Sequence, residues 1–133
     1  MSMMELHSLE AEHGVLGAML KQPHLISVLA DELAPDAFAY PANSDLYRLI
    51  LDLDAAGTPV DIITLGEARE YLPDNTRTMA YAGEILITTP SVANAKEYAR
   101  IVRERAVSRQ IVEAAARELA IGFVGPHAKI HVA

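Results

Sequence analysis

Cysteine is absent from the 133 residues, which excludes disulfide bonds, thiolate nucleophiles and zinc sites with cysteine ligands. Tryptophan is also absent and only two phenylalanines are present, although hydrophobic residues make up 51% of the chain. The core must therefore be built mainly from leucine, isoleucine, valine and alanine, as is typical of packed helices. The length fits one domain with a core of modest size.

Long apolar runs are missing too. No stretch approaches the roughly 20 apolar residues of a membrane-spanning helix. The first residues, MSMMELHSLEAEHG, contain no basic segment followed by an apolar run, so they do not look like a signal peptide. We therefore expect a cytoplasmic protein without a membrane partner.

Basic residues are in the minority, and the formal net charge is −7. Such an acidic chain lacks the basic footprint of an autonomous nucleic-acid-binding protein. The segment from Val92 to Ile121 differs from the rest, because six basic and four acidic residues give it a net charge of +2 and leave −9 for the remainder. This asymmetry favours electrostatic steering between subunits or toward a protein partner.

Helix signals dominate what is present. Apolar residues at helical spacing, start signals and stop signals predict an all-α fold, a compact bundle of about five short helices plus one long C-terminal helix. The first predicted helix begins after Ser8. The second runs from Pro23 to Leu33, the third from Asn43 to Ala56, and the fourth from a cap at Asp61 or Thr64 to Pro73. The fifth runs from Met79 to Thr88, and the long helix from Pro90 and Ser91 to Gly122. In domain terms, residues 1–8 form an N-terminal extension, 9–121 the helical domain and 122–133 an irregular tail.

Two points stay open at this stage. Gly14 and Gly17 interrupt the first helix, and either another helix approaches closely there or the glycines are simply tolerated. The segment PVDIIT can also be read as a short strand. We prefer a helix, because no second strand candidate exists to pair with it.

The last helix is the most unusual feature. About 28 residues at 1.5 Å per residue give about 42 Å, which is longer than a domain of this size is wide. Its first half places Tyr98, Ile101, Val102 and Ala106 on one side, where the preceding helices can cover them. Its second half carries Val107, Ile111, Ala115 and Leu119 at four-residue steps. We expect this second stripe to project and to associate with another protein, although the helix could instead fold back within one bundle.

Candidate chemistry is sparse. His127 and His131 lie four residues apart, but the glutamate of HExxH and further ligands are missing, so we predict no metal site. Asp52 with Asp54, and Glu10 with Glu12, are two apart on helices and do not face each other, so we read them as solvated rather than catalytic. We predict no catalytic and no cofactor-binding residue.

The arginines of the last helix have three readings. They form a solvated face with pairs such as Arg100–Glu104 and Glu113–Arg117, they dock a protein, or they contact DNA. The third reading is the weakest, because acidic residues interleave with the arginines and stacking aromatics are lacking.

Three segments together resemble one family. HSLEAEHGVLGAML, GTPVDIITL and TPSVANAKEYARIVRERAVSRQI occur in order and are similar to motifs of the N-terminal domain of the bacterial replicative DNA helicase DnaB. Three departures stand out. Asn43 occupies a position where the family commonly has histidine, the return helix of the family's helical hairpin is not found, and no G-x-x-x-x-G-K-[ST] loop is present to hold ATP phosphates.

The resemblance implies an all-α collar domain of a hexameric helicase. In that family the domains pair through their helical hairpins and assemble as a trimer of dimers. The collar surrounds single-stranded DNA and docks primase or a loader. ATP and Mg²⁺ would serve only the motor domain of a parent helicase, and this chain would have no activity of its own. The hairpin role falls on one set of residues: Arg103, Val107, Ile111, Val112, Ala115 and Leu119.

A different class of function also fits the resemblance. The chain could be a stand-alone phage or mobile-element protein that imitates this domain and acts as a helicase adaptor, loader or inhibitor. A reading frame that continues into a phosphate-binding loop would favour the helicase domain, and a stop codon after Ala133 would favour the imitator.

Overall fold

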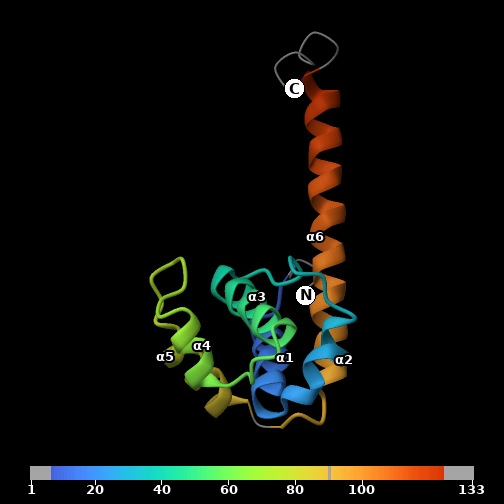
Figure 1. Cartoon of the computed structure of the whole chain (residues 1–133). Coiled ribbons are helices and arrows are strands. Elements are labelled where there is room, and N and C mark those ends of the chain that lie inside the picture. Colours follow the sequence, from blue (N-terminus) through green and yellow to red (C-terminus); the bar gives the residue numbers. More distant parts are fainter. Residues whose placement is uncertain (1–6, 90, 125–133) are drawn as a thin grey trace.

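The computed structural model describes residues 7–89 and 91–124 (Figure 1). The described part is helical, and its only β-type pairing is an isolated bridge between Tyr71 and Arg77. This confirms the predicted all-α class with short helices and one long helix. The elements are α1 (Leu9–Lys21), the 3₁₀ turn η2 (Pro23–Leu25), α2 (Ile26–Ala30), α3 (Pro41–Ala55), α4 (Ile62–Ala68), α5 (Thr78–Thr88) and α6 (Ala95–Val124).

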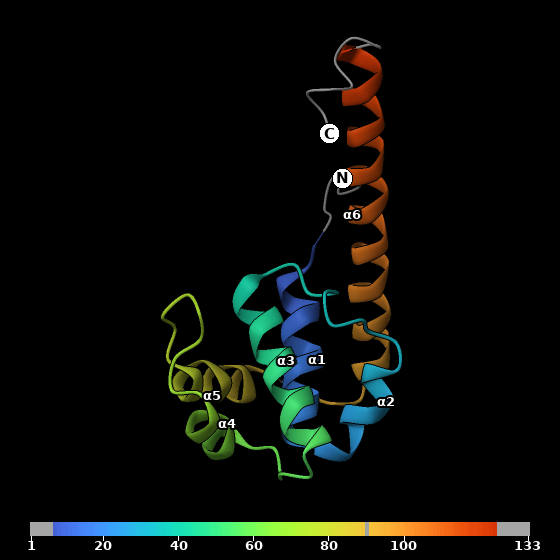
Figure 2. The same cartoon turned by 45° about the horizontal axis from the view of Figure 1, so that its top comes forward.

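Helix α1 is the centre of the body. Oγ of Ser8 accepts a hydrogen bond of 3.2 Å from the amide of Ala11, so Ser8 is the predicted N-cap. The helix then contacts α3, α5 and α6 on different sides (Figure 2). Because neighbours surround it, nearly every residue from Ala11 to Leu20 is buried, and only His13 is half-buried.

The predicted helix from Pro23 to Leu33 is wrong in length. A 3₁₀ turn is followed by α2, which ends at Ala30. The amides of Glu32 and Leu33 bond to carbonyl groups three residues back, so the chain tightens and leaves the α-helical path. Helix α3 begins at Pro41 rather than Asn43, since a proline lacks the amide that the first helical turn leaves unpaired.

Helix α4 shows whether Asp61 or Thr64 caps its N-terminus. Oδ1 of Asp61 accepts the amides of Ile63 and Thr64 at 2.9 and 2.8 Å, and Oγ1 of Thr64 accepts the amide of Asp61 at 3.0 Å. Both predicted caps therefore act together as a capping box, and the strand alternative for PVDIIT is not formed. The helix ends at Ala68 and not at Pro73, because the chain turns back there and the amide of Thr78 bonds to the carbonyl of Glu70.

Helix α6 starts later and ends later than predicted. It begins at Ala95 and continues through Gly122 to Val124, so the predicted irregular tail of residues 122–133 is wrong for its first three residues. Residues 125–133, with His127 and His131, lie outside the described residues. Figures 1 and 2 show that the second half of α6 extends well beyond the body formed by the other helices.

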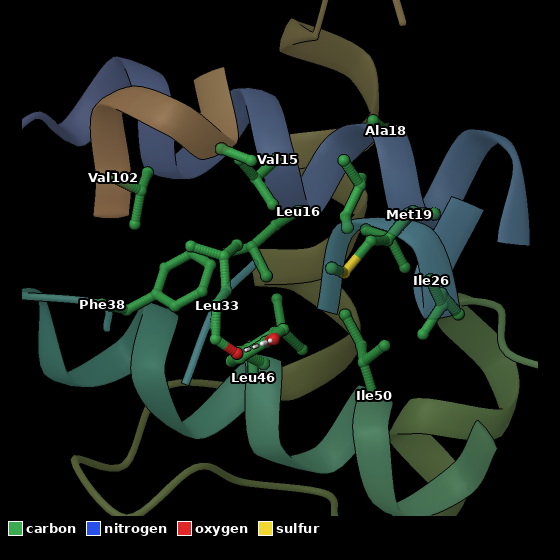
Figure 3. Packing of buried hydrophobic residues seen from close by; sticks show 14 of the residues in the cluster. Val15, Leu16, Ala18, Met19, Ile26, Leu33, Phe38, Leu46, Ile50 and Val102 are labelled. Atoms are coloured by element: carbon green, nitrogen blue, oxygen red, sulfur yellow. Dashed lines mark hydrogen bonds between the residues drawn. The ribbon is translucent and has the colours of Figure 1, made fainter. Parts of the chain in front are cut away.

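The core is mostly aliphatic, as the composition predicts. Figure 3 shows Leu16 and Met19 of α1 meeting Leu46 and Ile50 of α3, with Val102 of α6 close by. Each such side chain contributes about 1.5–3 kcal/mol when fully buried. This core fixes the first half of α6 against the body, whereas residues 110–120 of the same helix are exposed.

Candidate protein-interaction surface

Two glycines let α1 lie close to its neighbours, Gly14 to the first turn of α6 and Gly17 to Thr89 at the end of α5. A Cβ atom on Gly14 would lie 2.8 Å from Cε2 of Tyr98, and one on Gly17 would lie 2.6 Å from Cβ of Thr89. Both distances are shorter than carbon atoms tolerate, so no larger residue fits without a shift. The predicted approach of another helix is therefore confirmed at Gly14, where α6 lies close, whereas Gly17 is required by Thr89, the residue that follows α5.

Small residues line the face of α6 that packs on the body. Ala95, Ala99, Val102 and Ala106 are buried at intervals of three and four residues. A guanidinium nitrogen of Arg109 then donates a hydrogen bond of 2.8 Å to the carbonyl of Ala37. Beyond Arg109, every residue from Gln110 to Ala120 is exposed, so the anchored part of α6 ends at this contact.

The apolar residues after this point form a surface that we call the α6 ridge. Val107 is 48% exposed, Ile111 63% and Leu119 73%, so the predicted projection is confirmed and the fold-back alternative is not formed within residues 7–89 and 91–124. The ridge comprises Val107, Ile111, Val112, Ala115 and Leu119. Arg103, the sixth residue predicted for this surface, is exposed one turn before Val107. Contact of these residues with a partner stays a prediction.

The ridge faces away from the body. At about 100° per residue, Ala115 lies about 180° around the helix from the buried Ala106, and Ile111 and Leu119 lie about 140° away on either side. A partner on the ridge would therefore meet α6 from the side opposite the domain's own core.

Ion pairs lie on the solvent-exposed side of the anchored half of α6. The guanidinium of Arg100 bonds to the carboxylates of Glu97 and Glu104, each at 2.5 Å. The hydrogen bond from Arg100 lowers the pKa of Glu97, and the bond to Glu97 is the main cause that raises the pKa of Arg100. The predicted Arg100–Glu104 pair is thus confirmed. Since all three side chains are solvated, the pairs add little to stability.

One acidic residue is buried, which the sequence did not predict. Glu12 is only 1% exposed, so its interpretation as a solvated residue is wrong. Its Oε2 accepts the amide of Ala39 at 2.7 Å, while Oε1 accepts Nδ2 of Asn43 at 2.9 Å and the amide of Tyr40 at 3.4 Å. These donors come from residues about 30 positions away along the sequence, which is why helix periodicity alone could not find them.

The hydrogen-bond network of Glu12 continues to α5, and Glu12 fixes which group donates and which accepts at each step. Because Asn43 donates through Nδ2, its Oδ1 accepts the hydroxyl of Tyr81, and the Tyr81 oxygen in turn accepts Nε2–H of His13 at 3.0 Å. Burial raises the pKa of Tyr81 to about 12, helped by the charges of Glu12 and Glu84. Burial lowers the pKa of His13, and the same two carboxylates oppose that effect. The network therefore holds α1, α3 and α5 together.

The described residues contain no group of three potential metal ligands. In the same part of the chain, no helix is long and apolar enough to cross a membrane. What distinguishes the molecule is thus a polar network inside the body and an apolar ridge outside it.

The comparison with known families decides the relationship. The family model described as "DnaB-like helicase N terminal domain" matches residues 4–104, which is more than half of the chain. This chain belongs to that family. The ridge lies after the matched segment in the sequence, so this match gives no evidence about the role of the ridge.

Replicative helicases are similar to this DnaB-family chain over most of its length. It is 36% identical over 119 residues to the replicative DNA helicase DnaB of Mycobacterium leprae and 37% identical over 108 residues to that of Pasteurella multocida. The matched segments take up 88% and 80% of this chain but only 20% and 23% of those proteins. The chain therefore spans less than a quarter of the length of these relatives.

Solved structures share the fold. The N-terminal domain of DnaB helicase from Mycobacterium tuberculosis matches with a TM-score of 0.81 and 34% identity, over 95% of this chain and 93% of that one. The corresponding domain from Helicobacter pylori, described together with its interactions with primase, matches with a TM-score of 0.69 and 20% identity, over 83% of this chain and 89% of that one. The second likeness shows the fold alone.

Asn43 is a departure from the motif of the DnaB family. It replaces the histidine that the resemblance leads us to expect after Pro41 and Ala42, and it is fully buried. Its amide serves both neighbours, because it donates to Glu12 and accepts from Tyr81. In this chain Asn43 therefore forms a polar link between α1 and α5.

Proposed function

We propose that this chain is a non-catalytic collar domain of a hexameric replicative DNA helicase, whose subunits pair through the α6 ridge. The observation that carries the proposal is an uncovered apolar ridge on a projecting helix in a member of the DnaB family. Apolar side chains arranged at helical spacing on a free helix are typical of helix pairing. Pairing would bury the ridge without disturbing the core, because the two faces of α6 are opposite each other.

Charge supports a protein partner over DNA as the direct contact. The described body, residues 7–89, has 13 acidic and four basic residues, while α6 carries a small positive excess. DNA phosphates would be repelled by such a body. Single-stranded DNA would therefore be at most an indirect partner, surrounded by the assembled collar.

The second part of the proposal concerns primase and loaders. The Helicobacter pylori domain interacts with primase. We extend this to the present chain, which shares the fold, and include helicase loaders as the resemblance implies. ATP and Mg²⁺ would act in another domain of a parent helicase, since this sequence has no phosphate-binding loop of the Walker type.

A charge placed on the ridge tests the pairing. Ile111→Glu should shift the sedimentation of the chain toward the monomer and weaken association by about tenfold or more, because a carboxylate would be buried in an apolar contact. Gln110→Glu is the matched control, since it adds the same charge about 100° around the helix. Helical content by circular dichroism should be unchanged in both. Monomers only in the unmodified chain at high concentration would refute the pairing.

A further inference from the structure

Helix α5 carries a second uncovered apolar face. Met79, Gly83 and Ile87 follow one another at four-residue steps, so they lie on one side of the helix, and we call them the α5 stripe. Ile87 is 83% exposed and Met79 is 38% exposed. Figures 1 and 2 place α4 and α5 on the side of the body away from α6, so the α5 stripe is separate from the α6 ridge.

No neighbouring atom of the described residues requires a glycine at position 83. A Cβ atom added to it would have no atom within 4 Å, whereas Gly14 and Gly17 are required by close neighbours. Glycine in a helix interior costs about 1 kcal/mol relative to alanine. Its position between two exposed apolar residues forms a notch, which is the shape that lets the backbone of another helix approach.

Helix α4 widens this surface. The side chain of Met79 lies against Gly66, since a Cβ atom there would be 3.0 Å from Cε of Met79. Ile63 precedes Gly66 by one turn on the same face and is 60% exposed. The α5 stripe therefore continues onto α4 and gives anchor points for a helix laid across both.

Acidic residues border the stripe on both sides. Glu67 lines a hollow of about 320 Å³ together with Gly66 and Met79, and Glu84 stands one turn before Ile87. Arg77 lies at the N-terminal end of the stripe, where its guanidinium is 4.0 Å from Glu70. A basic rim on the partner would complement these borders and the excess of acidic residues over the body.

We propose that the α5 stripe and the adjoining face of α4 dock a basic amphipathic helix of a partner protein. The apolar side of that helix would cover Met79, Ile87 and Ile63 and approach closely at Gly83. Its lysine or arginine side chains would face Glu67 and Glu84. This surface is independent of the α6 ridge, so it can be occupied while subunits are paired.

The test uses the full chain and a synthetic amphipathic helix of about 18 leucine and lysine residues, with a leucine–glutamate twin as the charge control. We expect the lysine peptide to bind, the glutamate twin not to bind, and amide chemical shifts to change along α4 and α5. Gly83→Leu should weaken binding about tenfold by filling the notch. Because the site is open, this variant should melt no lower than the unmodified chain, which excludes misfolding as the cause.

Val28→Ser is the matched control, since Val28 is an exposed apolar residue of α2, away from the stripe. It should leave peptide binding unchanged, whereas Ile87→Ser should weaken it. Equal binding of both peptides, or shifts confined to other helices, would overturn the proposal. A smaller sedimentation coefficient for Gly83→Leu without peptide would also overturn it, by showing that a second copy occupies the stripe. The Ile111→Glu result does not affect these outcomes, so the two proposals fail separately.

Discussion

Nδ2 of Asn43 donates a hydrogen bond of 2.9 Å to Oε1 of Glu12, and both side chains are excluded from solvent. Glu12 also accepts the amides of Ala39 and Tyr40, which immediately precede α3. Tyr40, the N-cap residue of α3, offers no side-chain cap of its own. A carboxyl group of α1 thus caps a different helix, and its negative charge suits the positive end of the α3 dipole.

The first prediction concerns this cap. Glu12→Gln should lower the free energy of unfolding by about 2–4 kcal/mol, because an amide NH₂ would face donors and leave buried groups unpaired. Urea unfolding followed by circular dichroism measures the change. Glu10→Gln is the control, since Glu10 is exposed two residues away, and it should stay near the unmodified value. Equal unfolding midpoints for both variants would contradict the capping role of Glu12.

The second prediction concerns His13 and acid. Its pKa is lowered in the folded state by burial, so below about pH 6.5 the unfolded chain takes up a proton that the folded chain does not. Stability should therefore fall as the pH drops through that range. His13→Gln keeps an N–H donor for Tyr81 but does not titrate, and it should flatten this part of the stability curve. His24→Gln, at an exposed site, should keep the slope of the unmodified chain.

Local signals explain which parts of the fold could be predicted. Ser8 and Asp61 cap their helices through residues two or three positions away, so the sequence around them contains the whole interaction. Glu10 and Glu12 look equivalent by the same criteria, yet only Glu12 is buried. What separates them is the approach of the segment before α3, and such a contact is set by tertiary packing rather than by helix periodicity.

The same reasoning applies to the surfaces. The α6 ridge could be predicted because α6 is too long for the body and its apolar residues repeat at fixed steps. The α5 stripe could not, since Met79, Ile85 and Ile87 are similar in type and only packing on α1 and α4 decides which are covered. Gly83 gains significance only when the space around it is known.

The third prediction compares two glycines. Gly17→Ala should cost about 1–3 kcal/mol of stability, because the new methyl group would overlap the side chain of Thr89. Gly83→Ala should instead gain up to about 1 kcal/mol from helix propensity. Thermal melts of the two variants under identical conditions measure both effects. If Gly17→Ala left the melting temperature unchanged or raised it, the assigned packing of α1 against Thr89 would be incorrect.

The fourth prediction concerns the projecting part of α6. A chain that ends after Gln110 keeps every residue identified in the core and also Arg109, whose guanidinium bonds to the carbonyl of Ala37. In dilute solution it should unfold within about 1 kcal/mol of the full chain, since residues 111–120, which it loses, are solvent-exposed. Urea unfolding at low concentration measures this difference. A loss of several kcal/mol would mean that the chain's own body depends on the projecting segment.

Concentration distinguishes the two chains further. If the α6 ridge pairs subunits, the melting temperature of the full chain should rise with protein concentration, because association stabilises the folded state by mass action. The shortened chain lacks Ile111, Val112, Ala115 and Leu119, so its melting temperature should not depend on concentration. The Ile111→Glu variant should behave like the shortened chain while keeping the full length of the helix. Its agreement with the shortened chain would assign the association to the apolar ridge rather than to the length of α6.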